Sequence, residues 1–122
     1  MAEREATVVW EGDSRQVVRS FPADVRRNIG ADIYRLQLGE APHDSRPMKS
    51  IGHGVFELRQ RDGSGWYRLI YLARVGGTLY MLHGFTKKSA KTSRNDLAVA
   101  RNRLKTVRAR IAKEKKNANR NK

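Results

Sequence analysis

Charged side chains interrupt the two most regular predicted strands of this 122-residue chain. Glu57 and Arg59 are two residues apart, so strand alternation places them on one face, and Arg68 lies in the next predicted strand. Lys87 and Lys88 follow the end of a third predicted strand. A sheet face that carries these cations could bind an RNA backbone and stabilise the charge that develops on a phosphate during cleavage.

Such a face could cleave RNA without a protein nucleophile, because the 2′-OH of RNA can attack the adjacent phosphate. The protein must hold that phosphate in line, stabilise the added charge and assist two proton transfers. Each well-placed electrostatic contact lowers the barrier by on the order of 3 kcal/mol. The alternative is structural: Glu57 could pair with Arg59 or Arg68 across the hairpin, for roughly 0.2–1 kcal/mol. The pattern leaves both alternatives open.

Other kinds of catalytic site have little support in the residues. Cysteine is absent, which excludes disulfides, thiolate metal ligands and a cysteine nucleophile. His43, His53 and His83 lack the spacing of metal ligands, and glycine-rich phosphate loops, G-x-S-x-G and H-E-x-x-H are all missing. We therefore expect neither a metal ion nor another cofactor. His83 lies inside a predicted strand, where a catalytic role and a buried structural role both remain open.

The net charge of +14 is concentrated towards the C-terminus. From residue 87 to residue 122 there are 14 Lys or Arg and two acidic residues, which leaves 12 basic and 10 acidic residues in the first 86. A nearly neutral body with a strongly basic end indicates a polyanionic partner such as RNA or the ribosome. A basic tail that binds a protein partner, or that only aids solubility, is the alternative.

The length is that of one domain with a single modest core. We assign residues 1–112 to this domain and residues 113–122 to a basic, flexible tail, because the apolar residues end there. No signal peptide is visible, and no apolar run is long enough to cross a bilayer. The expectation is a soluble, cytoplasmic protein.

Apolar periodicity and turn residues predict an α+β fold with the order β-α-α-β-β-β-α. A helical hairpin is expected on one face of a small, mainly antiparallel sheet, with the other face free for a partner or substrate. Ser93-x-x-Asp96 resembles a capping box at the start of the C-terminal helix. The predicted strands are 6–10, 54–60, 66–74 and 78–85, the helices are 14–21, 22–38 and 93–112, and 40–53 is a loop.

Three segments resemble RelE/HigB-type toxins of bacterial toxin–antitoxin systems, within the RelE/ParE superfamily, and their motifs follow one another along the chain in the order that this family has. PMKSIGHGVFELRQRDGSGWYRLIY (47–71) is similar to their central signature. FPADVRRNIGADIYRLQLGEAP (21–42) and LHGFTKKSAKTSRNDLAVAR (82–101) resemble the helical hairpin and the ending of the phage-associated HigB branch. The resemblance covers about residues 7 to 111.

The resemblance implies a RelE-like fold and a growth-inhibiting toxin. Such a toxin would be a ribosome-dependent, metal-free endoribonuclease, an mRNA interferase that leaves a cyclic phosphate and a 5′-hydroxyl. Its expected partners are the ribosome, mRNA and a cognate antitoxin, often a helix-turn-helix HigA-like protein in this branch. No membrane partner is expected.

The resemblance also implies roles for particular residues. Arg59 takes the place of a catalytic strand lysine, and Arg68 that of the arginine that stabilises the phosphate. Lys87 or Lys88 would replace the basic residue after the last strand. Glu57 could act as a base or hold an arginine in place. The remaining candidates are His83 for catalysis and four cations for RNA binding: Lys49, Lys91, Arg94 and Arg101.

The sequence also departs from the RelE-like pattern. Relatives often carry a Tyr or His just after the last strand, but here no Tyr follows Tyr80 and no His follows His83. Two rival functions therefore stay open: a ParE-like gyrase poison of the same fold, and a non-catalytic RNA-binding module. Trp66 and Tyr67 are the aromatic candidates for stacking on bases, and one of them is expected in the core.

Overall fold

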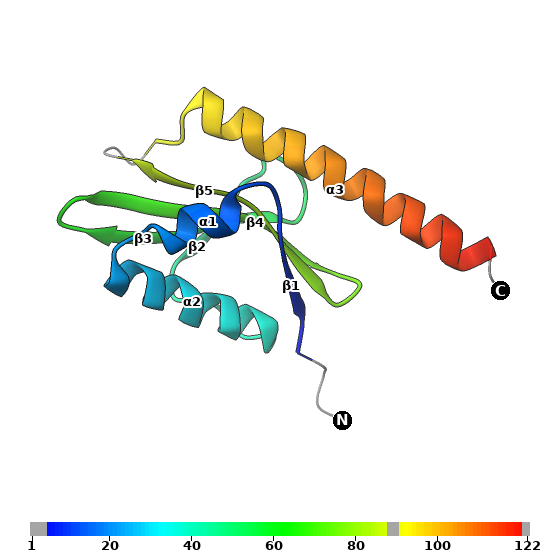
Figure 1. The fold of residues 1–122 in the computed structure, drawn as a ribbon, viewed down its shortest axis with the longest axis horizontal. Helices are drawn as coiled ribbons and strands as arrows, with labels where there is room; N and C mark the ends of the chain where they lie inside the picture. Colours follow the sequence, from blue (N-terminus) through cyan, green and yellow to red (C-terminus); the bar gives the residue numbers. More distant parts are fainter. Residues whose placement is uncertain (1–4, 88–90, 121–122) are drawn as a thin grey trace.

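The chain folds around one mixed sheet with helices on both sides, as Figure 1 shows. The computed structural model describes residues 5–87 and 91–120. The bounds of its elements are β1 Thr7–Trp10, α1 Ser14–Arg19, α2 Ala23–Gln37, β2 Ser45–Pro47, β3 Val55–Asp62, β4 Gly65–Val75, β5 Thr78–Lys87 and α3 Arg94–Arg120. Within the described ranges, no helix is long and apolar enough to cross a membrane.

Neighbouring strands follow the order β1-β5-β4-β3-β2. β1 runs parallel to β5, and the other three pairs are antiparallel. Gly76 and Gly77 join β4 to β5 with φ values of 57° and 82°, the left-handed backbone that a tight two-residue hairpin turn requires. The α+β class, the mainly antiparallel sheet and the predicted order of elements are confirmed.

One short strand lies in the segment predicted to be a loop. β2 pairs with β3 at the edge of the sheet, where Ser45 lies opposite Leu58 and Pro47 opposite Phe56. All three β2 residues are exposed. A proline is tolerated at a sheet edge because its missing N–H can face solvent. A three-residue strand of this kind has no apolar alternation, and for that reason the sequence pattern does not predict it.

The helices α1 and α2 cover one face of the sheet, as predicted for the helical hairpin. Apolar side chains from both helices meet alternate residues of β3, β4 and β5 in one buried cluster. Phe21 packs edge-to-face on Tyr67, with ring centroids 5.0 Å apart, so Tyr67 is the aromatic that belongs to the core. Members of this cluster include Val18, Phe21, Ile29, Leu58, Leu69 and Met81.

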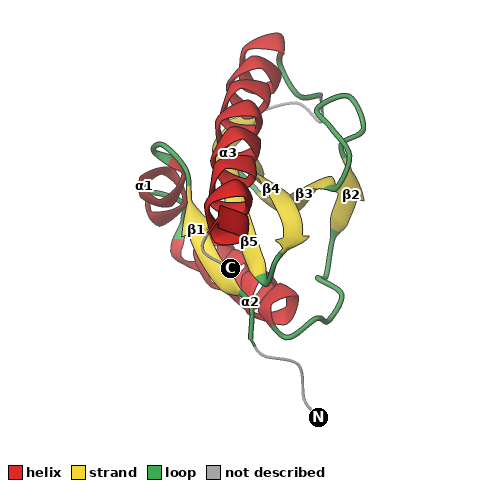
Figure 2. Ribbon diagram, turned by 90° about the vertical axis from the view of Figure 1, so that its right-hand side faces the viewer, coloured by secondary structure: helices red, strands yellow, loops and turns green. Residues whose placement is uncertain are grey.

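The C-terminal helix α3 packs on the opposite face, and Figures 1 and 2 show α2 and α3 on the two sides of the sheet. Leu104 and Val107 of α3 join Ile70 and Leu82 in a second buried cluster. The prediction that this face is free for a partner or substrate is therefore wrong over the length of the packed helix. The apolar stripe of α3 has to be buried, and the sheet offers the matching apolar surface.

The helix α3 passes residue 112, the predicted end of the domain, without a break and continues to Arg120. The segment 113–120, expected to be a flexible tail, is therefore helical, although all of its residues are exposed. Lys, Glu, Ala and Arg are strong helix formers, so a helix already fixed by packing extends into this segment without further burial. Figure 1 shows this end projecting past the sheet.

The second cluster makes the position of α3 testable. Leu104→Ala should lower the free energy of unfolding by about 2–5 kcal/mol, because Leu104 is only 4% exposed and its loss leaves a cavity between α3 and the sheet. Lys105→Ala, at an exposed neighbouring position, is the control and should change little. Urea denaturation of the three proteins measures the difference. Equal stabilities would mean that α3 does not pack as described.

Candidate functional site

Three of the predicted catalytic residues share one face of the sheet. Arg59 of β3 and Arg68 of β4 are direct cross-strand partners, so their side chains leave the same face. Glu57 lies two residues before Arg59 and faces the same way. Its cross-strand partner Ile70 belongs to the cluster under α3, which identifies this as the α3 face.

Glu57 and Arg68 form a buried ion pair. Nη1 of Arg68 donates to both carboxylate oxygens of Glu57, at 3.2 and 3.3 Å. The same nitrogen donates to Oγ1 of Thr92, just before α3, at 3.1 Å. The two charged side chains are 0% and 1% exposed. The cross-strand pair that the sequence left open as a structural alternative is therefore present.

Burial dominates the electrostatics of this pair. It raises the pKa of Glu57 above its usual value, although the charges of Arg68 and Arg59 and the hydrogen bonds from Arg68 and Thr92 oppose the shift. A buried pair of this kind adds little net stability, because desolvation offsets the attraction. Removing one partner is costly, since the other charge is then left uncompensated. The pair therefore fixes the position of Arg68 between β3 and the start of α3.

Three guanidinium groups surround the half-buried ring of Trp66, and we call this group the arginine cluster. The guanidinium carbons of Arg59, Arg61 and Arg68 lie 4.8, 5.0 and 5.6 Å from the ring centroid. Cation–π attraction of roughly 0.5–2 kcal/mol per contact offsets part of their mutual repulsion. Nε of Arg59 is buried and has no hydrogen-bond partner in the described part of the chain. The cluster thus concentrates donors at one place on the sheet.

Lys87 lies directly across from Trp66 in β5, next to the arginine cluster. Its ammonium is 3.2 Å from Asp96 of α3, and the same carboxylate lies 2.8 Å from Nε2 of His83. Oγ of Ser93 also donates to Asp96, and the backbone N–H of Asp96 donates to Ser93, which confirms the predicted cap. Burial opposes ionisation of Asp96, but the hydrogen bonds from His83, Ser93 and Lys87 outweigh it and lower its pKa.

The other candidates lie around this centre or outside the described residues. His83 is 9% exposed and stacks on Phe85, with centroids 5.2 Å apart. Arg101 donates to the carbonyl oxygen of Ser50 at 2.9 and 3.1 Å, which brings it beside the loop that carries Lys49. Lys88 lies outside the described residues. The four predicted RNA-binding cations are all exposed: Lys49, Lys91, Arg94 and Arg101.

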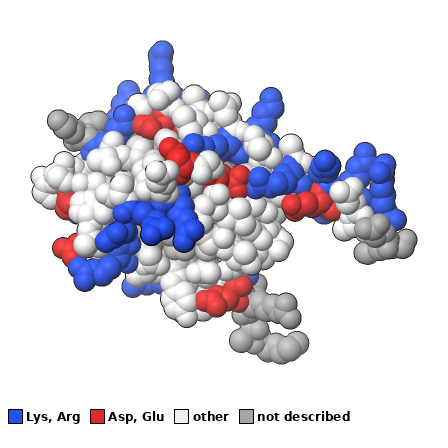
Figure 3. Space-filling model, viewed as in Figure 1, with Lys and Arg blue, Asp and Glu red and all other residues white. Residues whose placement is uncertain are grey.

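Basic side chains also gather over α1 and α2, on the side of the molecule seen in Figure 3. There Nη1 of Arg26 in α2 donates to the carbonyl oxygen of Arg19 in α1 at 3.3 Å, and both side chains are exposed. The cations of the folded protein are therefore spread over more of the surface than the basic last third of the sequence suggests.

The sequence pattern does not predict Arg61, Thr92 or the link from Asp96 to Lys87 and His83. Arg61 joins Trp66 and Lys87 in one cross-strand row, which depends on strand register. Asp62 pairs with Gly65, so the β3–β4 turn has two residues. Taking this turn as two residues long, instead of the longer predicted connection, would have placed Arg61 opposite Trp66.

Removal of the buried carboxylate tests the ion pair. Glu57→Ala should lower the free energy of unfolding by about 3–5 kcal/mol, because the guanidinium of Arg68 is left buried without its carboxylate. Asp24→Ala is the matched control: its ion pair with Arg27 has both side chains at least 75% exposed and contributes about 1 kcal/mol or less. Chemical denaturation at neutral pH compares the two losses, and similar losses would contradict the assigned pair.

The lowered pKa of Asp96 predicts a pH dependence. The stabilisation from ionised Asp96 is complete above the ordinary value of 3.8 and is lost as the pH falls through the lower pKa of the folded state. The wild type should therefore be more stable than Asp96→Asn at pH 6, and this difference should shrink at acid pH. Thermal unfolding between pH 2.5 and pH 7 measures it. A difference that is constant over this range would contradict the lowered pKa.

The fold was compared with solved structures, and one match is the RelBE2 toxin–antitoxin complex from Mycobacterium tuberculosis. The aligned chains are 19% identical, with a TM-score of 0.48, and the match covers 70% of this chain and 95% of the other. No match was found among curated proteins.

A protein-family comparison matches most of the domain. The family described as "Phage derived protein Gp49-like (DUF891)" covers residues 16–105, from α1 through the sheet and into α3. This range contains the ion pair, the arginine cluster and the Asp96 contacts. It agrees with the phage-associated branch that the sequence motifs resemble. The chain therefore belongs to the phage-derived Gp49-like family.

Proposed function

We propose that this protein is the RelE/HigB-type toxin of a type II toxin–antitoxin module and cleaves mRNA on the ribosome. The observation that carries the proposal is the arginine cluster around Trp66, with Lys87 directly across from it. Membership of the Gp49-like family and the motif resemblance over residues 7–111 also support it. The reaction class is attack of the RNA 2′-OH on the neighbouring phosphate.

Charge stabilisation is the main task of this site. The 2′-oxygen forms a bond to phosphorus while the bond to the 5′-oxygen breaks, which gives a cyclic phosphate and a 5′-hydroxyl. We assign the added phosphate charge to Arg59, Arg68 and Lys87, together with the undescribed Lys88. Of Arg59 and Arg68, Arg59 is the more suitable, because it is partly exposed, whereas Arg68 is 1% exposed and paired with Glu57.

Two proton transfers accompany the bond changes, and Glu57 and His83 are the side chains proposed for them. Burial raises the pKa of Glu57 towards the working range of a general base. Glu57 also holds Arg68 in place, so the two roles suggested by the sequence are compatible at one residue. His83 is held by Asp96, which orients its ring.

Binding to the ribosome and mRNA would use the exposed cations around this centre, above all Lys49, Lys91, Arg94 and Arg101. Contacts of this kind bind the phosphate backbone without reading its sequence, and they weaken as the salt concentration rises. As the toxin of such a module, the protein would be neutralised by a cognate antitoxin, for which we propose a helix-turn-helix HigA-like protein.

Substitution of Arg59 tests the proposed activity. Arg59→Ala should slow mRNA cleavage on purified ribosomes about 100- to 1,000-fold, the usual loss for one electrostatic contact to the transition state. Its fold should be retained, because Arg59 is outside the buried ion pair. Arg27→Ala, an exposed arginine of α2, is the control and should cleave like the wild type. Cleavage sites are mapped from RNA 5′ ends.

Induction of the wild type in cells separates the proposed function from its rivals. We expect new transcript 5′ ends together with a growth arrest. Arg59→Ala should abolish this growth arrest. Intact transcripts with a DNA-damage response would instead identify a gyrase poison. Salt-sensitive RNA binding without cleavage, even with ribosomes present, would identify a non-catalytic RNA-binding module.

A further inference from the structure

The last helix carries a row of cations on the side that faces away from the sheet. Its members lie within an arc of about 80°, because each residue of an α-helix turns the chain by about 100°. Leu104 and Val107, which are buried against the sheet, lie on the opposite side of the helix. We call this row the basic stripe, and it consists of Lys105, Lys113, Lys116 and Arg120.

The basic stripe is exposed along its whole length and has one sign of charge. Most of it belongs to the segment 113–120, which projects past the sheet (Figure 1), and Figure 3 shows basic side chains along this end of the molecule. Glu114 is the single acidic residue of the segment. It is four residues after Arg110 and therefore lies on the side of α3 where Arg110 binds Glu11.

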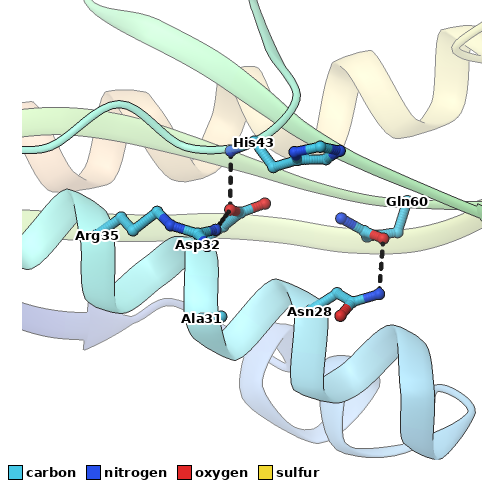
Figure 4. A pocket seen from close by; sticks show the side chains of 6 residues that line it. All are labelled: Asn28, Ala31, Asp32, Arg35, His43 and Gln60. Atoms are coloured by element: carbon cyan, nitrogen blue, oxygen red, sulfur yellow. Dashed lines mark hydrogen bonds and ion pairs between the residues drawn. The ribbon is translucent and has the colours of Figure 1, made fainter.

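Other arginines of the protein are held by partners within the fold. In α3, Nη2 of Arg103 donates to Asp13 at 2.8 Å, and Nη2 of Arg108 donates to the carbonyl oxygen of His53 at 2.6 Å. On the other side of the sheet, Arg35 of α2 binds Asp32, as Figure 4 shows.

The basic stripe has no partner of this kind. Within the described ranges, none of its four side chains forms a hydrogen bond or an ion pair. Lys113 and Lys116 are three residues apart, and Lys116 and Arg120 are four apart, so like charges repel each other along the helix. Stabilisation of the fold therefore does not account for these cations, and they are available to an external polyanion.

The other residues of the projecting segment indicate which polyanion fits. The described part of α3 contains no aromatic residue, whereas proteins that bind single-stranded RNA use aromatic rings to stack on the bases. The apolar residues of the segment are limited to alanine, so it has no large apolar face to insert into a membrane surface. Cations on a rigid helix suit the regularly spaced phosphates of double-helical RNA, which proteins recognise by shape and backbone contacts.

We propose that the basic stripe docks the protein on a double-helical segment of ribosomal RNA. The proposal deepens the proposed function and rests on it, because that function brings the protein to the ribosome. Its four cations contact phosphates of the RNA backbone and read no base sequence. Ala109 lies between Lys105 and Lys113 on the same side of the helix, and its small side chain lets the RNA come close to the helix backbone.

This contact is separate from the proposed cleavage site. Asp96, which binds Lys87 beside the arginine cluster, is in the first turn of α3. At a rise of 1.5 Å per residue, the basic stripe lies roughly 14 to 36 Å further along the helix axis. Three of its four residues also lie beyond residue 105, where the family match ends. The stripe should therefore affect affinity for the ribosome and leave the chemical step unchanged.

The salt dependence of RNA binding tests the proposal with the full chain. The probes are an RNA hairpin with a double-helical stem and an unstructured RNA strand of the same length, and fluorescence anisotropy measures binding. The hairpin should bind more tightly than the single strand. A triple variant, Lys113→Gln, Lys116→Gln and Arg120→Gln, should lower the slope of log K against log salt for the hairpin by about 2 to 3, because three phosphate contacts are lost.

A second triple variant controls for net charge. Arg15→Gln, Arg19→Gln and Arg26→Gln remove the same number of charges from exposed positions of α1 and α2 and should leave the slope unchanged. Glutamine forms helices about as well as lysine and arginine, so the stripe variant should keep its fold. Equal slopes for the wild type and the stripe variant, equal losses in the two variants, or equal binding of hairpin and single strand would overturn the proposal.

Cleavage on purified ribosomes separates this proposal from the proposed function. The stripe variant should raise KM for ribosome-bound mRNA and leave kcat unchanged. If mRNA is cut and KM does not change, the docking surface is wrong and the nuclease stands. If no mRNA is cut but the stripe variant binds ribosomes more weakly than the control variant in co-sedimentation, the docking surface stands and the nuclease is wrong.

Discussion

A carboxylate and a guanidinium that are shut away from water constrain the whole candidate site. Glu57 and Arg68 are buried against each other, and their geometry leaves little freedom to either strand. Since the same guanidinium nitrogen also binds Thr92, the pair connects the central hairpin to the residues just before α3. One interaction thus connects β3, β4 and the residue two positions before α3.

That constraint explains how a small sheet accommodates both a core and a cationic site on a single face. Towards Leu104 and Val107 the face is apolar and covered by α3. Towards Trp66 it is cationic, and three guanidinium groups lie close to the indole. The ion pair lies at the boundary. It lets the face change from apolar to charged within a few residues, because the innermost charges neutralise each other.

The sequence predicted most of the architecture because local chemistry determines it. Glycine turns fixed the hairpins, apolar periodicity fixed α2 and α3, and Ser93 with Asp96 marked the start of the last helix. The edge strand β2 and the packing of α3 on the sheet were not predicted, since they depend on tertiary pairing. The same is true of the site: alternation assigned Glu57 and Arg59 to one face, whereas the positions of Arg68 and Arg61 beside them depend on the strand register.

The buried carboxylate of Asp32 in α2 shows another limit of sequence patterns. Asp32 lies on the same helix as Ile29 and Ile33. In the sequence, a single carboxylate at this position looks like an ordinary polar residue of a helix. Only the fold reveals that its second oxygen is buried, and only the loop after α2 supplies the backbone group that holds the first. Buried polar contacts between segments that are far apart in the sequence cannot be predicted from the spacing of residues.

The unpacked end of α3 has a consequence for how the molecule opens. Residues 113–120 are helical but make no buried contact, so their backbone hydrogen bonds are held by local helix formation alone. Amide hydrogens there should exchange with solvent within a short time, while those around Val107 exchange only when α3 leaves the sheet. One continuous helix would therefore contain two zones of exchange, divided where its apolar stripe ends near Ile111.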